Sequence, residues 1–160
     1  MDCFTLFYFK FLKSQPTDEH FWTNQINTPL VNTWMGLAFE RVCMEHIEQI
    51  KVKLGISGVL TEVNSWYCKA DLDNGVFGSP IDMLIVRKDQ VINLCEMKYS
   101  QSEYTITEKV DRNIRNKISD LITVSGTKYA IYPTIITTYG LVENSYSQEV
   151  QSVVTMDDLF

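Results

Sequence analysis

Two carboxylates and a lysine lie close together in a predicted β-hairpin. The segments Ile81–Arg87 and Val91–Lys98 are rich in Ile, Val, Leu and Met, and the polar residues 88–90 separate them, which predicts two strands joined by a three-residue loop. In that register Asp82 lies directly opposite Glu96, with Cβ atoms about 4.5–5.5 Å apart. Because like charges at this distance repel, we expect a cation between them, and carboxylate oxygens suit Mg²⁺ or Mn²⁺.

The alternation of side chains along a strand places this acid pair at the end of an apolar surface. Lys98 shares the face of Glu96, and the other residues of that face are apolar: Leu84, Val86, Ile92 and Leu94. The alternative is an exposed hairpin with ordinary surface charges, since an Asp followed by Glu-x-Lys recurs by chance. A shift of the pairing by one residue would also reverse every face.

A third acid, Glu40, lies in the strongest predicted helix, Asn32–Leu54, which Asn32 or Thr33 can cap and Gly55 can end. An unpaired buried carboxylate is costly, so Glu40 needs a partner. It either assists a metal site or bonds a nearby amide or lysine in a structural role. At about 100° per residue, the residues within about 80° of Glu40 are mostly apolar: Gly36, Leu37, Cys43, Met44, Ile47 and Ile50.

A second helix, predicted over Thr105–Val124 with Gly126 at its end, carries most of the basic residues of the chain. A charged helix face is usually solvated, but beside the acids it would also serve to contact phosphates. The basic residues of this helix are Lys109, Arg112, Arg115 and Lys117.

The composition narrows the class of protein. The chain has 160 residues and a net charge of −6, which fits one domain with a real core and argues mildly against indiscriminate binding of duplex nucleic acid. Four cysteines without a C-x-x-C pair make a structural zinc site unlikely and favour reduced thiols in a cytoplasm. No apolar run approaches the length of a membrane span, so we expect no membrane partner.

The order of predicted elements indicates an α/β or α+β fold, in which helices flank a mixed central sheet. We expect an aromatic segment over residues 1–30, packed on the domain or on a partner, followed by a domain over residues 31–160. Three local features are also predicted: a turn at Gln15–Asp18 followed by a short helical turn around Phe21-Trp22, a turn or bulge at Asn64-Ser65, and an edge or bulge at Pro133 in the strand 128–139.

This arrangement resembles the PD-(D/E)xK, restriction-endonuclease-like nuclease superfamily, in which a helix with an acid is followed by Pro-Ile-Asp82 and then Glu96-Met97-Lys98. More closely, the segments Trp34–Cys43 and Ile92–Ser100 are similar to the C-terminal domain of bacterial ATP-binding proteins of the archaeal-ATPase type. Residues 2–13 resemble the segment that joins the ATPase part to the nuclease-like part. The sequence has no G-x-x-x-x-G-K-[ST] phosphate loop, so we expect a detached or truncated nuclease-like domain rather than the ATPase.

The resemblance implies a role for each matching residue. Asp82 and Glu96 would hold Mg²⁺ or Mn²⁺, with the Met97 carbonyl as a further ligand. Lys98 would orient or help deprotonate the attacking water, and Glu40 would assist from the helix. The DNA backbone would lie against the basic helix, on Lys109, Arg112 and Arg115.

Two functions therefore remain open. The first is a metal-dependent nuclease-like domain that hydrolyses DNA phosphodiester bonds. The second is a catalytically silent domain that kept the fold and binds a protein or nucleic-acid partner. An ATPase domain, or a second copy of the chain, would then bind through residues 1–13.

Overall fold

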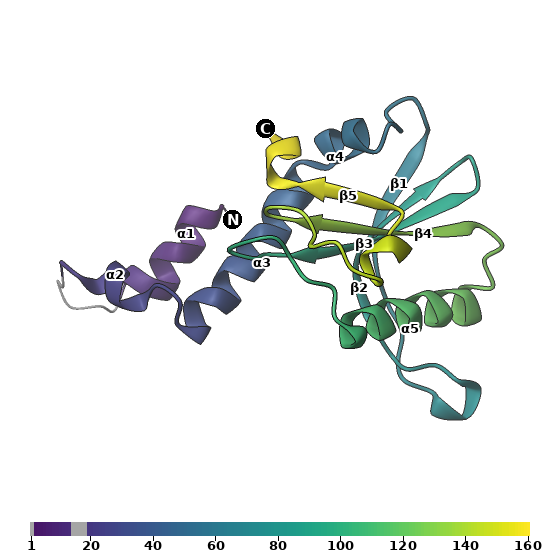
Figure 1. Ribbon diagram of the computed structural model, residues 1–160, viewed down its shortest axis with the longest axis horizontal. Helices are drawn as coiled ribbons and strands as arrows, with labels where there is room; N and C mark the ends of the chain where they lie inside the picture. Colours follow the sequence, from purple (N-terminus) through teal and green to yellow (C-terminus); the bar gives the residue numbers. More distant parts are fainter. Residues whose placement is uncertain (1, 14–18) are drawn as a thin grey trace. The chain divides into compact units, whose positions relative to one another are not determined.

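The computed structural model describes residues 2–13 and 19–160, which fall into two compact units, Met1–Glu45 and His46–Phe160 (Figure 1). The N-terminal unit is helical. Its elements are α1 (Cys3–Phe7), a short π-helix η1 (Tyr8–Leu12), α2 (Phe21–Gln25) and α3 (Pro29–Glu45).

Aromatic rings hold the N-terminal unit together. Phe11 is 2% exposed, and its ring centroid lies 5.2–5.9 Å from those of Phe7, Trp22 and Trp34. The predicted aromatic segment therefore packs on residues of its own unit, and packing on a partner stays a prediction. The short helical turn around Phe21-Trp22 is confirmed by α2, whereas the turn predicted at Gln15–Asp18 lies outside the described residues.

The single helix predicted over Asn32–Leu54 is wrong, because two helices occupy this region. The first, α3, begins earlier at Pro29, a residue whose missing N–H costs nothing at a helix start. His46 then leaves the helical conformation, with φ −115° and ψ 32°, and its ring packs 4.7 Å from that of Phe160. The second helix, α4 (Ile47–Lys53), is followed by Gly55 at φ +69°, as predicted.

The C-terminal unit is built on a five-stranded mixed sheet, which confirms the predicted α/β class. The strand order follows the sequence, β1-β2-β3-β4-β5. Neighbours are antiparallel from β1 to β3 and parallel from β3 to β5. The strands are β1 (Thr61–Tyr67), β2 (Pro80–Arg87), β3 (Val91–Lys98), β4 (Ala130–Thr137) and β5 (Ser152–Thr155).

The hairpin formed by β2 and β3 has the predicted register, and its limits are those predicted except that β2 begins one residue earlier, at Pro80. Met83 pairs with Cys95 and Val86 with Ile92, so the same register sets Asp82 opposite Glu96. The loop turns at Gln90, whose φ of +67° is the left-handed conformation that a three-residue hairpin loop uses.

Two local irregularities were predicted in the strands, and one is present. The β1–β2 register shifts between Asn64 and Trp66, which confirms the predicted turn or bulge as a bulge.

The edge or bulge predicted at Pro133 is wrong. Pro133 lies in β4, which has a neighbour on each side, and it pairs with Leu94 of β3 without a shift of register. The strand β5 begins only at the next position, opposite Thr134, and the Pro133 carbonyl accepts from the Gln151 N–H at 3.0 Å just before it.

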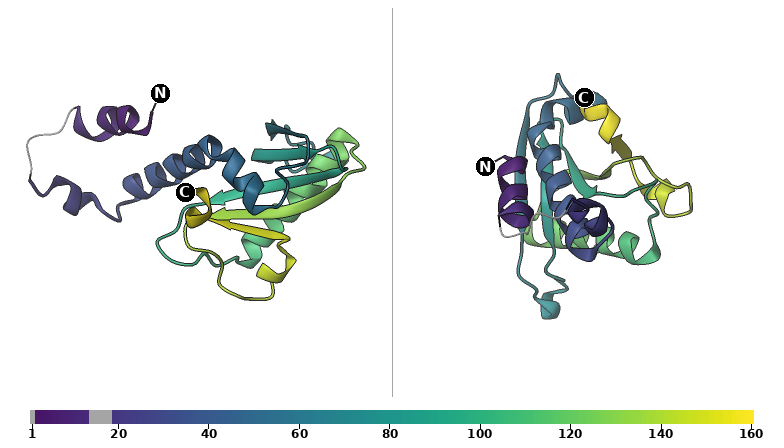
Figure 2. Two further views of the ribbon diagram at one scale, coloured as in Figure 1. Left: turned by 90° about the horizontal axis from the view of Figure 1, so that it is seen from above. Right: turned by 90° about the vertical axis from the view of Figure 1, so that its left-hand side faces the viewer.

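The helix α5 (Glu108–Ser125) connects β3 to β4 in the sequence and runs along one face of this sheet (Figures 1 and 2). The Thr107 hydroxyl caps its start by accepting from the Val110 N–H, and Gly126 ends it at φ +63°. Leu121 packs in a core cluster with the apolar residues of the hairpin. In the described part of the chain, no helix is both long and apolar enough to cross a membrane.

Gly78, in the loop that leads into β2, has a backbone that only glycine adopts easily. Its φ is +81°, and an added Cβ would lie 2.5 Å from the backbone nitrogen of Ala70. We expect Gly78→Ala to lower the free energy of unfolding by about 1–3 kcal/mol, measured by urea denaturation. The matched control is Gly58→Ala, where a Cβ would meet nothing within 4 Å. Equal stability of the two variants would contradict this reading of the loop.

Candidate active site

The hairpin brings three of the predicted site residues to one end of the sheet face that α5 covers. Asp82 and Glu96 are opposed across β2 and β3, and Lys98 follows Glu96 by two residues on the same side. Glu96 is 4% exposed, while Asp82 and Lys98 are half-buried. The site thus has a buried inner acid and a more accessible outer edge.

Two ammonium groups hold the carboxylate of Glu96. The Lys98 Nζ lies 2.7 Å from Oε1, and the Lys117 Nζ lies 2.6 Å from Oε2. Lys117 comes from α5, and its side chain is 7% exposed, against 34% for that of Lys98. Each carboxylate oxygen therefore has its own cation, one from the strand and one from the helix.

The ion pairs shift the pKa values of Glu96 and Lys98 so that both side chains are charged. Burial opposes the ionisation of Glu96, but Lys98 and Lys117 outweigh it and hold the pKa of Glu96 below its ordinary value. Burial likewise opposes the charge on Lys98, yet Glu96, with smaller contributions from Tyr104 and Asp82, raises the Lys98 pKa. Both partners consequently stay charged at neutral pH.

A second buried acid on α5, Asp120, fixes the loop before β2. Its Oδ1 accepts from the Phe77 N–H at 2.8 Å and its Oδ2 from the Gly78 N–H at 3.0 Å. Asp120 is completely buried, so these bonds form without competition from water. Asp82 lies four residues beyond Gly78, so this bond pair positions the strand that carries it.

Comparison with known proteins gives a family. The family model DUF234, described as Archaea bacterial proteins of unknown function, matches residues 7–113, about two thirds of the chain. The chain belongs to this family. No curated protein and no solved structure matches it. The DUF234 match contains Glu40, Asp82, Glu96 and Lys98, and it ends within α5, before Lys117 and Asp120.

Two further residues that sequence reasoning assigned to the site are placed differently from the three above. Glu40 lies in α3, within the N-terminal unit, and its part in the site stays a prediction. Met97 is 3% exposed, and strand alternation turns its side chain to the sheet face opposite that of Glu96. A role for its backbone carbonyl as a metal ligand also stays a prediction.

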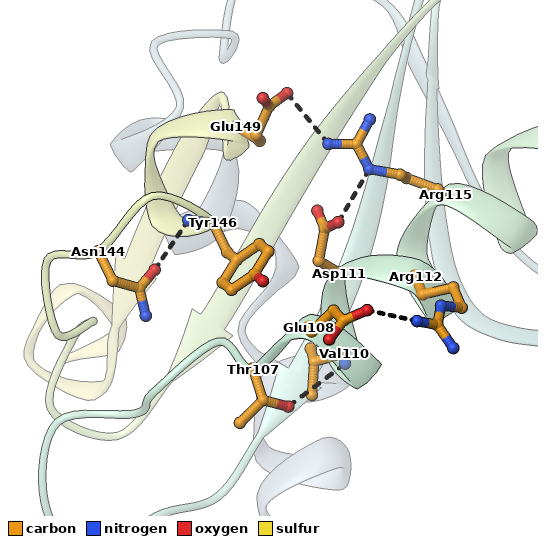
Figure 3. Close-up of polar contacts among 9 residues, drawn as sticks. All are labelled: Thr107, Glu108, Val110, Asp111, Arg112, Arg115, Asn144, Tyr146 and Glu149. Atoms are coloured by element: carbon orange, nitrogen blue, oxygen red, sulfur yellow. Dashed lines mark hydrogen bonds and ion pairs between the residues drawn. The ribbon is translucent and has the colours of Figure 1, made fainter.

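The basic residues predicted to contact DNA lie on the first half of α5, and two of them have acidic partners (Figure 3). Arg112 pairs with Glu108 one turn away. Arg115 lies 2.9 Å from Asp111 and 3.6 Å from Glu149. Both arginine side chains are exposed, and ion pairs of exposed side chains are weak, so a phosphate could replace the acid. DNA contact by Lys109, Arg112 and Arg115 stays a prediction.

The sequence analysis did not assign three residues around the candidate site to it: Tyr104, Lys117 and Asp120. Lys117 was grouped with the basic helix face, yet it lies three residues after the buried Ile114 and four before the buried Leu121. Residues at this spacing share one helix face, so the sequence did contain a signal that Lys117 points inward. Tyr104, whose own pKa burial raises, lies in a loop and carried no comparable signal.

The donor set suits a divalent cation that keeps part of its water. Among the described residues, no three His, Cys, Asp or Glu side chains gather to form a cage. Mg²⁺ is commonly bound by one or two carboxylates together with waters and substrate phosphates. Glu96 uses one acceptor position on each oxygen for the lysines, and each oxygen has a second. Asp82 and Glu96 therefore fit this kind of site.

Replacing Glu96 by Gln tests the buried ion pairs. Glu96→Gln leaves two ammonium groups beside a neutral amide, so we expect the free energy of unfolding at pH 7 to fall by about 3–5 kcal/mol. The Glu96 pKa is lower in the folded chain than the roughly 4.3 of an unfolded one, so its contribution is present above that pH. It is lost as the pH falls through the folded pKa.

The measurement is urea denaturation at a series of pH values. The difference between wild type and Glu96→Gln should shrink as the pH falls below about 4. Glu62→Gln is the control, because its ion pair with Lys88 is exposed on both sides and contributes about 0–1 kcal/mol. A Glu96→Gln deficit that stays constant down to pH 2 would contradict the account.

Proposed function

We propose that this DUF234 chain is a metal-dependent, nuclease-like domain of the PD-(D/E)xK kind that hydrolyses DNA phosphodiester bonds in the cytoplasm. One observation carries the proposal: the buried, ionised Glu96 lies opposite Asp82 with Lys98 bonded to it at 2.7 Å. Metal-assisted phosphodiester hydrolysis needs two acids and a nearby cation in such a cluster.

Each residue has a defined part in the proposed chemistry. Asp82 and Glu96 would hold Mg²⁺ or Mn²⁺, which supplies Lewis acidity toward a phosphate oxygen and a more acidic bound water. Lys98 is the more exposed of the two lysines on Glu96, so it can reach a water or a phosphate oxygen at the outer edge. Its positive charge would offset the charge that builds on the phosphate in the transition state.

The first test is metal binding followed by cleavage. We expect Mn²⁺ to bind the wild type in calorimetry at millimolar concentrations, and Asp82→Asn to abolish that heat because one of two carboxylate ligands is lost. Lys98→Ala should bind Mn²⁺ but cleave plasmid DNA at least about 100-fold more slowly.

The matched control is Asp73→Asn, which removes an exposed carboxylate from the turn before β2 and should leave both binding and cleavage unchanged. If Lys98→Ala cleaved as fast as the wild type, the proposed mechanism would be wrong. If the wild type bound no metal and cleaved no DNA, the second function below would take its place.

A second candidate is a catalytically silent domain that binds a partner. The lysine pairs favour it, because Lys98 and Lys117 already balance Glu96 and Asp82 without any metal. Apolar residues of the first two helices are also accessible: Phe4 is 71% exposed and Phe9 54%. An ATPase domain or a second copy of this chain would then bind at this surface.

Light scattering during size-exclusion chromatography tests self-association through this surface. If the surface binds a second copy, the wild type should elute as an oligomer that Phe9→Ser converts to monomer. Val52→Ser is the control, because Val52 is more accessible than Phe9, at 68% against 54% exposed, but lies in α4. A wild type that stays monomeric at high concentration would contradict self-association.

A further inference from the structure

Lys117 carries a buried positive charge next to Glu96, and the proposed function gives it no role. We propose that Lys117 is a positioning residue, which fixes the carboxylate of Glu96 from α5 so that Lys98 stays available to the substrate. This inference rests on the proposed function and deepens it. The contact that carries it is the 2.6 Å ion pair between Lys117 Nζ and Glu96 Oε2, in which both side chains are nearly inaccessible.

The helix that carries Lys117 is itself firmly placed. Its buried residues Ile114 and Leu121 pack against the sheet on either side of Lys117 along the same helix face. Asp120, three residues on, bonds the backbone of the loop before β2. On the same face of α5, Lys117 thus binds Glu96 of β3. Asp120 accepts two backbone N–H bonds from the loop that leads to Asp82 in β2.

The contribution of the buried Lys117–Glu96 ion pair to folding stability does not by itself explain why a lysine occupies this position. Burying two charges costs several kcal/mol per ion in lost hydration, and apolar residues of the same volume are often as stabilising or more so. The buried residues Ile114 and Leu121 flank Lys117 on its helix face, so a Leu or Met there would continue the apolar stripe. Its charge is therefore better explained by what it does to Glu96.

The two lysines on Glu96 have different surroundings. Lys98 is partly exposed and lies near Tyr104 and Asp82 as well as Glu96. For Lys117, the one partner found among the described residues is Glu96. With Oε2 tied to the helix, the carboxylate cannot rotate away when Lys98 exchanges Glu96 for a water or a phosphate oxygen. Lys117 thus keeps the ligand in place during the exchange.

The test compares Lys117→Met, Lys117→Gln and Lys117→Arg with the wild type in Mn²⁺ calorimetry and in steady-state cleavage of DNA at saturating Mn²⁺. Lys117→Met keeps an unbranched side chain but removes the ammonium group. Lys117→Gln keeps a hydrogen-bond donor without the charge, and Lys117→Arg keeps a cation. Lys128→Met removes an exposed lysine beyond the end of α5 and is the control. Thermal unfolding identifies any variant that does not fold.

We expect Lys117→Met to bind Mn²⁺ within about tenfold of the wild type and to lower kcat about 10–100-fold, with the KM for DNA unchanged. The kcat of Lys117→Gln should lie between those of Lys117→Met and the wild type, and Lys117→Arg should retain most of the wild-type kcat. If Lys117 is only a resident counter-ion, Lys117→Met will instead bind Mn²⁺ more tightly and keep its kcat, which would overturn the inference. A wild type without metal-dependent cleavage would overturn the proposed function and this inference together.

Discussion

A carboxylate buried in an apolar interior must have cations beside it, and Glu96 meets this requirement with one lysine from its own strand and one from α5. The rest of the C-terminal unit follows from that pair. The hairpin must set β3 in the register that points Glu96 toward the helix. The helix α5 must cross the sheet so that Lys117 lies within reach of Glu96. Asp120 then ties the entry of β2 to the same helix.

The formal charges of this cluster balance, and they bear on the proposed binding of a cation. Asp82 and Glu96 contribute two negative charges, and Lys98 and Lys117 contribute two positive ones. A divalent ion would leave the cluster with an excess positive charge, which an anionic phosphodiester compensates. The proposed substrate and the proposed metal therefore favour each other's binding, in keeping with the preference of Mg²⁺ for substrate phosphates as ligands.

The sequence predicted the parts of this arrangement that local rules determine. The alternation of apolar residues and the three-residue loop were enough to set β2 and β3 in register and to place Asp82 opposite Glu96. Long-range contacts were not available to such reasoning. The helix break at His46 accompanies the packing of its ring on Phe160, a contact more than a hundred residues apart.

Lys117 shows the same limit inside a correctly predicted helix. Four basic residues in α5 suggested one charged face, but three of them are exposed and Lys117 is buried. Its buried neighbours Ile114 and Leu121 carried that information. A lysine in an apolar stripe indicates a buried acid elsewhere in the fold, and here that acid is Glu96.

The most direct test of the account is to locate a bound Mn²⁺ ion by anomalous diffraction from crystals of the protein grown with MnCl₂ and a short DNA duplex. We expect an anomalous peak in contact with carboxylate oxygens of both Asp82 and Glu96, with Lys117 still bonded to Glu96. A crystal with no peak at these residues, and with Lys98 and Lys117 both still bonded to Glu96 beside the duplex, would contradict it.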